Sequence, residues 1–155
     1  MKKGNLYYYF KNKEEILFAC HQYSLDCVLR LLEDIQASDL TPPEKLRALI
    51  VAFVHTILDE LHGTALFLQL DALSPSHSKA VIARRDRFDR GMRRVIEEGI
   101  TGGAFKVVRP EDAKLLSFAI LGAVNWIPRW YNPSGPATSS EIADRFADYL
   151  LAGLR

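Results

Sequence analysis

Cysteine is scarce in this sequence of 155 residues, and the two that occur, Cys20 and Cys27, are seven positions apart. Seven residues is two helical turns, so within a helix the two side chains share a face about 10 Å apart along the axis. That separation is too long for a disulfide, and free cysteine behaves as a small buried hydrophobe. We therefore expect both cysteines to pack in the core, and nothing indicates an oxidising compartment.

Long uninterrupted apolar runs are also missing. No apolar stretch with a small-residue cleavage site follows Met1, so the sequence shows no signal peptide. The most apolar segment, residues 115–127, is interrupted by Ser117 and Asn125 and is too short to span a bilayer. We expect a cytoplasmic protein that makes no contact with a membrane.

Motifs typical of enzymes are absent as well. The sequence has no nucleophile elbow, no phosphate-binding glycine loop and no CxxC pair. His55 and His62, with Asp59 between them, fall on one helical face and would allow a metal site, but acidic residues near a helix end are more often solvated. We therefore expect no enzyme activity, no metal and no cofactor.

Apolar residues recur at helical spacing along most of the chain, and no segment alternates as a strand would. The composition, 48% apolar and 25% charged, is typical of a globular domain. The net charge of +1 neither indicates nor excludes a nucleic-acid partner, because charge on one face matters more than the total. The predicted fold class is all-α.

Caps and prolines mark where the expected helices begin. Asn12, with Glu15 three residues later, precedes a long apolar stripe. The segment 41–44, Thr-Pro-Pro-Glu, combines an N-cap, proline at the first helical position and a capping acid, and opens a helix expected to end near Gly63. Further helices are expected at about residues 64–73, 75–101, 110–127 and 138–154.

Residues 115–127 are apolar on nearly every side, and a helix of that kind must be buried on every side. In a chain of this size, that pattern indicates a second subunit that covers the outer side. We expect a homodimer whose interface includes Leu121, Val124, Trp130, Phe146 and Leu150.

The opening segment, residues 2–13, combines four lysines and three tyrosines with two apolar anchors, Leu6 and Phe10, one helical turn apart. This spacing predicts a short helix whose lysines and phenol hydroxyls face outward, and both groups are ordinary phosphate contacts. From composition alone, the alternative is a basic N-terminal helix that packs its aromatic rings on the core.

The strings KGNLYYYF at residues 3–10 and KEEIL at residues 13–17 resemble the end of the DNA-binding domain of TetR-family transcriptional repressors. The resemblance implies that residues 1–14 are the remnant of a helix-turn-helix domain, with the recognition helix, and that residues 15–155 form the helical ligand-binding and dimerisation domain. The two helices that precede a recognition helix in that family have no counterpart here. We therefore expect this chain alone not to bind operator DNA with useful affinity.

The same resemblance implies which side chains contact DNA. Lys3, Asn5, Tyr7 and Tyr8 would face the major groove and its edges. Tyr9 and Lys13 would hold backbone phosphates, and Lys13 would be aided by the positive N-terminus of its helix.

Two clusters are candidates for a ligand site. The helix expected from Ser74 has seven basic residues against Asp86 and Asp89. It is either a solvated face with acid–base pairs or a site for an anionic ligand held by forked guanidiniums. The second cluster, residues 125–135, contains two tryptophans, an arginine and an asparagine, although aromatic residues at such spacing are more often core or interface.

Residues 125–135 and 142–148 resemble the C-terminal region of TetR-type regulators of fatty-acid and steroid catabolism. Those regulators sense acyl-CoA thioesters, and the ligand releases them from DNA, so the resemblance implies an acyl-CoA-like effector. The alternative is a helical ligand-binding or protein-interaction module that does not bind DNA. The expected ligand contacts are Phe53, Ile57, Phe67, Leu70, Arg84, Arg87, Phe88, Asn125, Trp126 and Arg129.

Overall fold

A computed structural model of the chain describes residues 10–61, 70–106 and 109–154. These segments are helical and contain no strand, which confirms the all-α prediction for the part of the chain described. The α-helices are α2 (Lys13–Gln36), α3 (Pro42–His55), α4 (Pro75–Thr101), α5 (Ala113–Trp126) and α6 (Ser139–Ala152). The shorter helices are the π-helix η1 (Thr56–Glu60) and the 3-10 helices η2 (Leu70–Ala72), η3 (Pro110–Asp112) and η4 (Ile127–Arg129).

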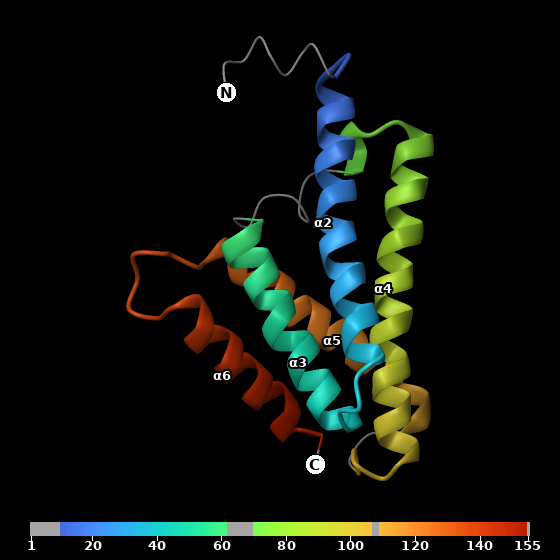
Figure 1. The fold of residues 1–155 in the computed structure, drawn as a ribbon, viewed down its shortest axis with the longest axis vertical. Coiled ribbons are helices and arrows are strands. Elements are labelled where there is room, and N and C mark those ends of the chain that lie inside the picture. Colours follow the sequence, from blue (N-terminus) through green and yellow to red (C-terminus); the bar gives the residue numbers. More distant parts are fainter. Residues whose placement is uncertain (1–9, 62–69, 107–108, 155) are drawn as a thin grey trace.

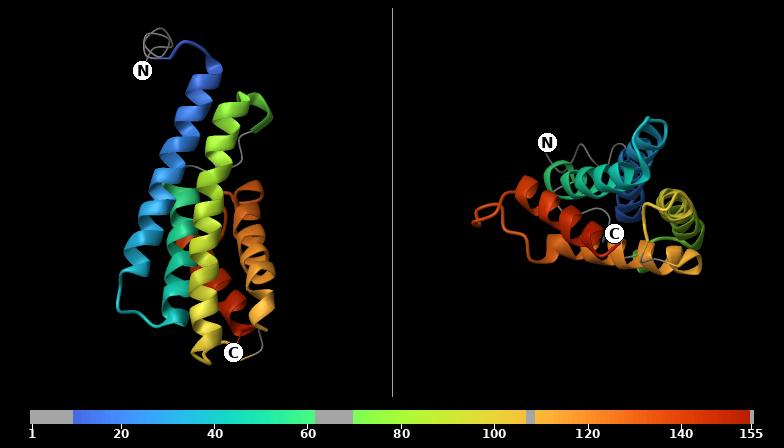
Figure 2. Two further views of the ribbon diagram at one scale, coloured as in Figure 1. Left: turned by 90° about the vertical axis from the view of Figure 1, so that its right-hand side faces the viewer. Right: turned by 90° about the horizontal axis from the view of Figure 1, so that it is seen from below.

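The two longest helices, α2 and α4, run side by side (Figures 1 and 2). Helix α3 packs against both of them and against α6, while α5 packs against α4 and α3. The first turns of α2 and α4 lie together at one end of the molecule, beyond the ends of α3 and α6 (Figure 1). The N-terminal ends of these two helices are therefore neighbours in space.

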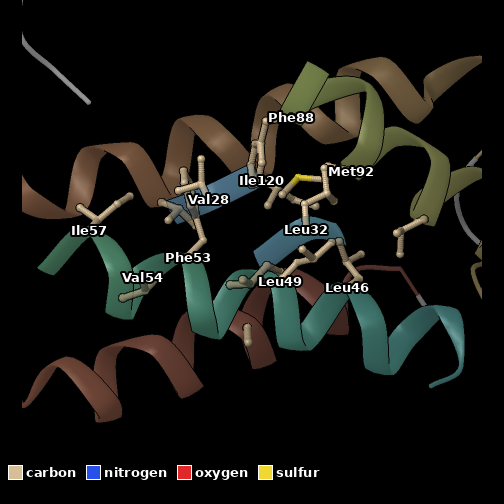
Figure 3. Packing of buried hydrophobic residues seen from close by; sticks show 14 of the residues in the cluster. Val28, Leu32, Leu46, Leu49, Phe53, Val54, Ile57, Phe88, Met92 and Ile120 are labelled. Atoms are coloured by element: carbon tan, nitrogen blue, oxygen red, sulfur yellow. The ribbon is translucent and has the colours of Figure 1, made fainter. Parts of the chain in front are cut away.

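The hydrophobic core lies around α3, whose inner face is almost completely removed from solvent. Leu46, Leu49, Ile50 and Val54 are 0% exposed. Side chains from α2, α4 and α5 meet this face, as the close view of the core shows (Figure 3). Side chains packed this closely have little room to move, so an empty space beside them keeps its size and shape.

The predicted caps form hydrogen bonds at the helix starts. The Glu15 N–H donates to Asn12 Oδ1 at 2.9 Å, and the Thr138 N–H donates to Glu141 Oε2 at 2.8 Å. The corresponding distance from the Thr41 N–H to Glu44 Oε2 is also 2.8 Å. Each contact pairs a backbone donor at a helix N-terminus that has no partner within the helix. The positions of α2, α3 and α6 were therefore readable from sequence.

Several boundaries differ from the prediction. The α-helical hydrogen bonding of α3 ends at His55, and the chain continues to Glu60 as a π-helix, in place of one α-helix to Gly63. Pro110 opens a 3-10 turn, and α5 begins at Ala113. Most of the short helix expected at residues 64–73 lies outside the described residues. Apolar spacing does not distinguish these patterns over one turn, because the 3-10 and π-helix each differ from the α-helix by only one residue in the spacing of their hydrogen bonds.

The prediction that both cysteines pack in the core is wrong for Cys20, which is exposed, while Cys27 is half-buried. The buried face of α2 follows His21, Leu25 and Val28. Cys20 precedes His21 by one residue, a rotation of about 100° around the helix axis, so it faces away from this stripe. Both cysteines are free thiols, in agreement with the predicted absence of a disulfide.

Helix α5 is buried on one side only within this chain. Ile120 and Val124 are 0% and 1% exposed, whereas Leu115, Phe118 and Trp126 are 65%, 50% and 58% exposed. The expectation that this helix is buried on every side is therefore not met by the single protomer. Its outer face is an apolar surface that the rest of the described chain leaves uncovered.

Candidate ligand-binding site

A cavity of about 230 Å³ lies between α2, α3, α4 and α5. It is mostly apolar, with one charged and one amide side chain. The lining residues are Leu25, Val28, Phe53, Arg85, Phe88, Leu121 and Asn125. Because four helices contribute to it, the cavity depends on how those helices pack and not on any one segment.

The floor of the cavity is formed by almost completely buried side chains. Leu25 and Val28 are each 1% exposed, and Phe53 and Phe88 are 4% and 5% exposed. The rings of Phe53 and Phe88 stack with centroids 5.0 Å apart and an interplanar angle of 28°. Figure 3 shows Val28, Phe53 and Phe88 converging from α2, α3 and α4. An apolar ligand group that reached this depth would lose all contact with water.

The mouth of the cavity is formed by half-buried residues, Arg85, Leu121 and Asn125. Burial lowers the pKa of the Arg85 guanidinium, because removal from water disfavours a cation. Arginine nevertheless stays protonated at neutral pH. A partly desolvated cation interacts strongly with a ligand carbonyl or anion, so the polar end of a bound molecule is expected here.

A larger and more polar recess of about 500 Å³ adjoins the cavity and shares Arg85 and Leu121 with it. It is lined by four cationic and two acidic side chains and by two apolar ones. The complete lining is Arg85, Asp86, Asp89, Arg90, Arg93, Lys114, Phe118 and Leu121. We call this surface the basic recess. It suits a ligand that carries negative charge outside the apolar cavity.

Asp89 organises part of the basic recess. It is 8% exposed and accepts hydrogen bonds from Ser117 Oγ, at 2.5 Å, and from the Arg93 guanidinium. Arg93 also lies over the Phe118 ring, 5.3 Å from its centroid, and Lys114 approaches the same ring at 5.6 Å. The Phe118 ring thus makes cation–π contacts with two basic side chains, one from α4 and one from α5.

Some of the predicted ligand contacts line the cavity and others do not. Phe53, Phe88 and Asn125 are lining residues. Ile57 belongs to the buried core and Leu70 packs against it. The remaining apolar candidate, Phe67, lies outside the described residues.

The tryptophan and arginine at the end of α5 stay on the surface. Trp126 is 58% exposed, and the Arg129 guanidinium lies 4.8 Å from the centroid of its ring. Neither residue lines the cavity or the basic recess. Their predicted role in ligand binding therefore has no geometric support in the single chain.

The two predicted arginines of α4 face α2 and not the cavity. Arg84 donates to Gln22 Oε1 at 2.5 Å and pairs with Asp26, and Arg87 pairs with Glu33. The arginine that lines the cavity is instead Arg85, which the sequence analysis did not single out. Arg85 shares a helical face with Phe88 three residues later, so the phase of α4 relative to its buried residues was the signal that would have identified it.

One of the predicted DNA contacts, Lys13, lies within the described residues, and it is exposed at the start of α2. The other predicted DNA contacts, Lys3, Asn5, Tyr7, Tyr8 and Tyr9, lie outside the described residues.

Contacts between the first turns of α2 and α4 form what we call the α2–α4 clasp. Glu14 Oε1 accepts the Ser74 N–H at 2.9 Å and contacts His77 Nδ1 at 2.6 Å. The His77 ring stacks on Phe18 with centroids 3.8 Å apart and an interplanar angle of 5°. The clasp therefore fixes the start of α2 against the helix that carries Arg85 and Phe88.

The clasp is expected to weaken in acid. The Ser74 N–H and then His77 lower the pKa of Glu14, so the ionised carboxylate is the form that stabilises the fold. This contribution is complete above the usual glutamate pKa and is lost as the pH falls through the lowered value. Glu14→Gln is expected to lower the melting temperature at pH 7, and its difference from the unchanged chain is expected to disappear once the pH lies below that lowered pKa.

Thermal unfolding followed by circular dichroism over a pH series measures this difference. Asp34→Asn, which removes a carboxylate from the exposed face of the same helix, is the matched control and should change little at any pH. A Glu14→Gln effect of constant size down to strongly acidic pH would contradict the assignment.

The predicted dimer residues occupy different environments. Val124 is 1% exposed and packs in the core of its own chain, so it offers no surface to a partner, and Leu121 lies at the cavity mouth. Trp130 is 48% exposed and stacks on Phe146 at 6.0 Å. Leu150 packs against the core and is half-buried.

No metal-binding cluster of three or more His, Cys, Asp or Glu side chains occurs in the ranges that the structure describes. His55 Nδ1 contacts Asp59 Oδ2 at 2.8 Å, and Asp59 also accepts Ser139 Oγ at 3.0 Å. His62 lies outside those ranges. Within them, no helix has the length and apolar content needed to cross a membrane.

Comparison with known proteins gives a consistent result. Residues 39–154 match the family model described as "Tetracyclin repressor-like, C-terminal domain". The HTH-type transcriptional repressor KstR2 of Mycobacterium tuberculosis is 28% identical in an alignment 155 positions long. This alignment covers 97% of this chain and 76% of that protein.

Solved structures with a similar fold include two regulators. The TetR-family regulator PfmR from Thermus thermophilus superposes with a TM-score of 0.86 at 29% identity, covering 100% of this chain and 84% of that one. AibR, in complex with isovaleryl coenzyme A and operator DNA, superposes with a TM-score of 0.81 at 26% identity, covering 97% of this chain and 81% of that one.

Proposed function

Because this chain belongs to the TetR family of transcriptional regulators, which are not enzymes, we propose that it is the ligand-binding part of a repressor that an acyl-coenzyme A thioester releases from DNA. One observation carries the choice of effector: the apolar cavity opens beside the basic recess, and Arg85 belongs to both. An acyl-CoA presents an apolar acyl group, a thioester carbonyl and phosphates in the same order.

Each part of the ligand has a chemically matched surface. The acyl group fills the cavity above Phe53 and Phe88. Arg85 and the amide of Asn125 offer hydrogen-bond donors for the thioester carbonyl. The arginines and the lysine of the basic recess attract the phosphates, for which the forked guanidinium is well suited. The AibR complex with isovaleryl coenzyme A supports this class of ligand.

We also propose that the chain is a homodimer through the outer face of α5 and the adjacent surface of α6. Exposed apolar side chains gather on these helices and the segment between them: Leu115, Phe118, Trp126, Trp130 and Tyr149. A globular protein rarely leaves such a surface open to water, and a two-fold dimer is the commonest way to cover it. A dimer also holds two DNA-binding segments, which we call the reading heads, at the fixed spacing that a two-fold symmetric operator requires.

The proposed reading head includes residues 1–14, with Lys3, Asn5, Tyr7, Tyr8, Tyr9 and Lys13 as DNA contacts. The α2–α4 clasp supports a route from ligand to DNA, because α4 takes part in both sites. It contributes Arg85 and Phe88 to the cavity. Its N-cap residue Ser74 and, three residues later, His77 belong to the clasp. A ligand acts by preferring one arrangement of α4 over another. The arrangement it prefers would be the one in which the two heads no longer match the operator.

Isothermal titration calorimetry tests the effector class. Isovaleryl coenzyme A is expected to bind more tightly than free coenzyme A or isovaleric acid, because only the thioester occupies both the cavity and the basic recess. The thioester should gain about tenfold or more over free coenzyme A from burial of its acyl carbons. Absence of heat with every acyl-CoA of a chain-length series would overturn the proposal.

A further inference from the structure

We propose that the stacked pair Phe53 and Phe88 sets the length of the acyl group, so that the effector is a short or compact acyl thioester and not a long-chain one. This inference rests on the proposed function, because it concerns which member of the acyl-CoA class the cavity accepts. It names two residues as determinants of specificity.

The first argument is the size of the cavity. Its volume of about 230 Å³ lies below the range of roughly 300–1,000 Å³ typical of pockets that enclose drug-sized ligands. A compact branched or short acyl group fits a space of this size. A long alkyl chain would have to leave the cavity again or displace its walls.

The second argument is the direction in which the cavity fills. Arg85, which is shared with the basic recess, and Asn125 are half-buried, whereas Phe53 and Phe88 are nearly inaccessible to solvent. A ligand anchored by its phosphates in the basic recess therefore enters past Arg85 and points its terminal carbon toward the two rings. The aromatic pair is where the acyl chain must stop.

The third argument is what lies next to the two rings along their own helices. Met92, one turn after Phe88 on α4, is 0% exposed, and Leu49 and Ile50, one turn before Phe53 on α3, are also 0% exposed. All three side chains belong to the same close-packed core, in which Figure 3 labels Met92 and Leu49. Because a core of native density has little spare volume, the rings have nowhere to retreat when a longer chain arrives.

The expected signature is a break in the dependence of affinity on chain length. Each methylene that enters the cavity should raise affinity about fourfold. The gain should stop once the acyl group reaches the aromatic pair, and affinity should then fall because further carbons are left exposed or strain the walls.

Calorimetry with acetyl, isovaleryl, octanoyl and palmitoyl coenzyme A, applied to the full chain, locates this break. We expect the unchanged chain to bind isovaleryl coenzyme A more tightly than palmitoyl coenzyme A. Phe53→Leu and Phe88→Leu, which shorten the floor while keeping it apolar, should shift the preference toward octanoyl coenzyme A. Phe105→Leu is the matched control, because Phe105 is 2% exposed in the turn after α4 and does not line the cavity.

The outcomes separate the two proposals. Affinity that keeps rising to palmitoyl coenzyme A, or floor variants that keep the length preference of the unchanged chain, would overturn the role of Phe53 and Phe88 while leaving an acyl-CoA effector in place. The same length shift in Phe105→Leu would overturn it too, because the effect would then be general loosening of the core. No binding of any thioester would overturn both proposals.

Discussion

The Leu115→Glu variant is expected to be a monomer at concentrations where the unchanged chain is a dimer. Leu115 is 65% exposed on the outer face of α5, so a glutamate there is solvated in the free protomer and costs its fold little. In a two-fold dimer the charge enters the interface twice and must lose water on both sides. The dissociation constant of the dimer should rise by about 100-fold or more, as measured by sedimentation equilibrium.

Ile82→Glu provides the matched control for this experiment. Ile82 is another exposed apolar residue, 45% accessible, but it belongs to α4, which is not one of the helices of the proposed interface. Its replacement should leave the association state unchanged. If Leu115→Glu remains a dimer, or if both variants dissociate to the same degree, the outer face of α5 is not the dimer interface.

Arg85→Met is expected to lower the affinity for isovaleryl coenzyme A by about 10- to 100-fold, the usual loss when a hydrogen bond to a charged partner is removed. Methionine keeps an apolar stem of similar length at the cavity mouth, so the cavity itself should persist. Calorimetry measures the loss, and the affinity for free coenzyme A should fall as well, because Arg85 also lines the basic recess.

Arg87→Met tests whether the position of the removed positive charge matters, or only the change in the net charge of the protein. Arg87 is two residues from Arg85 but pairs with Glu33 of α2, outside both the cavity and the basic recess. This variant removes the same charge and should bind the thioester within about twofold of the unchanged chain, as expected for an exposed ion pair. Equal losses in Arg85→Met and Arg87→Met would mean that overall charge, and not the site, attracts the ligand.

The helix starts were predictable because the chemistry that defines them is local. The side chain of Asn12 and the N–H of Glu15 are three residues apart, and so are Thr138 and Glu141. Their hydrogen bonds form whatever the rest of the chain does. The family resemblance was readable for a similar reason, since it rested on short strings of adjacent residues.

The side of α4 that faces the cavity was not predictable in the same way. Sequence analysis recognised a basic helix but selected Arg84 and Arg87, whereas Arg85 faces the cavity. Neighbouring residues of a helix point about 100° apart. The choice among them depends on which side α2, α3 and α5 cover.

Val124 and Leu115 illustrate the same limit on α5. Both are apolar residues of a helix that is apolar all round, yet Val124 is 1% exposed and Leu115 is 65% exposed. The division between a core face and an outer face arises from the neighbours that α3 and α4 provide. No periodicity in the segment itself distinguishes the two faces.

By itself, the amino-acid sequence determined that this chain is helical, where most of its helices begin, and which family it resembles. Tertiary structure alone decided that an apolar cavity and a basic recess meet at Arg85 and that Phe53 and Phe88 close the cavity floor. The physical reason is range: caps and apolar spacing act within a few residues, whereas a cavity exists only where four distant segments fail to fill the space between them.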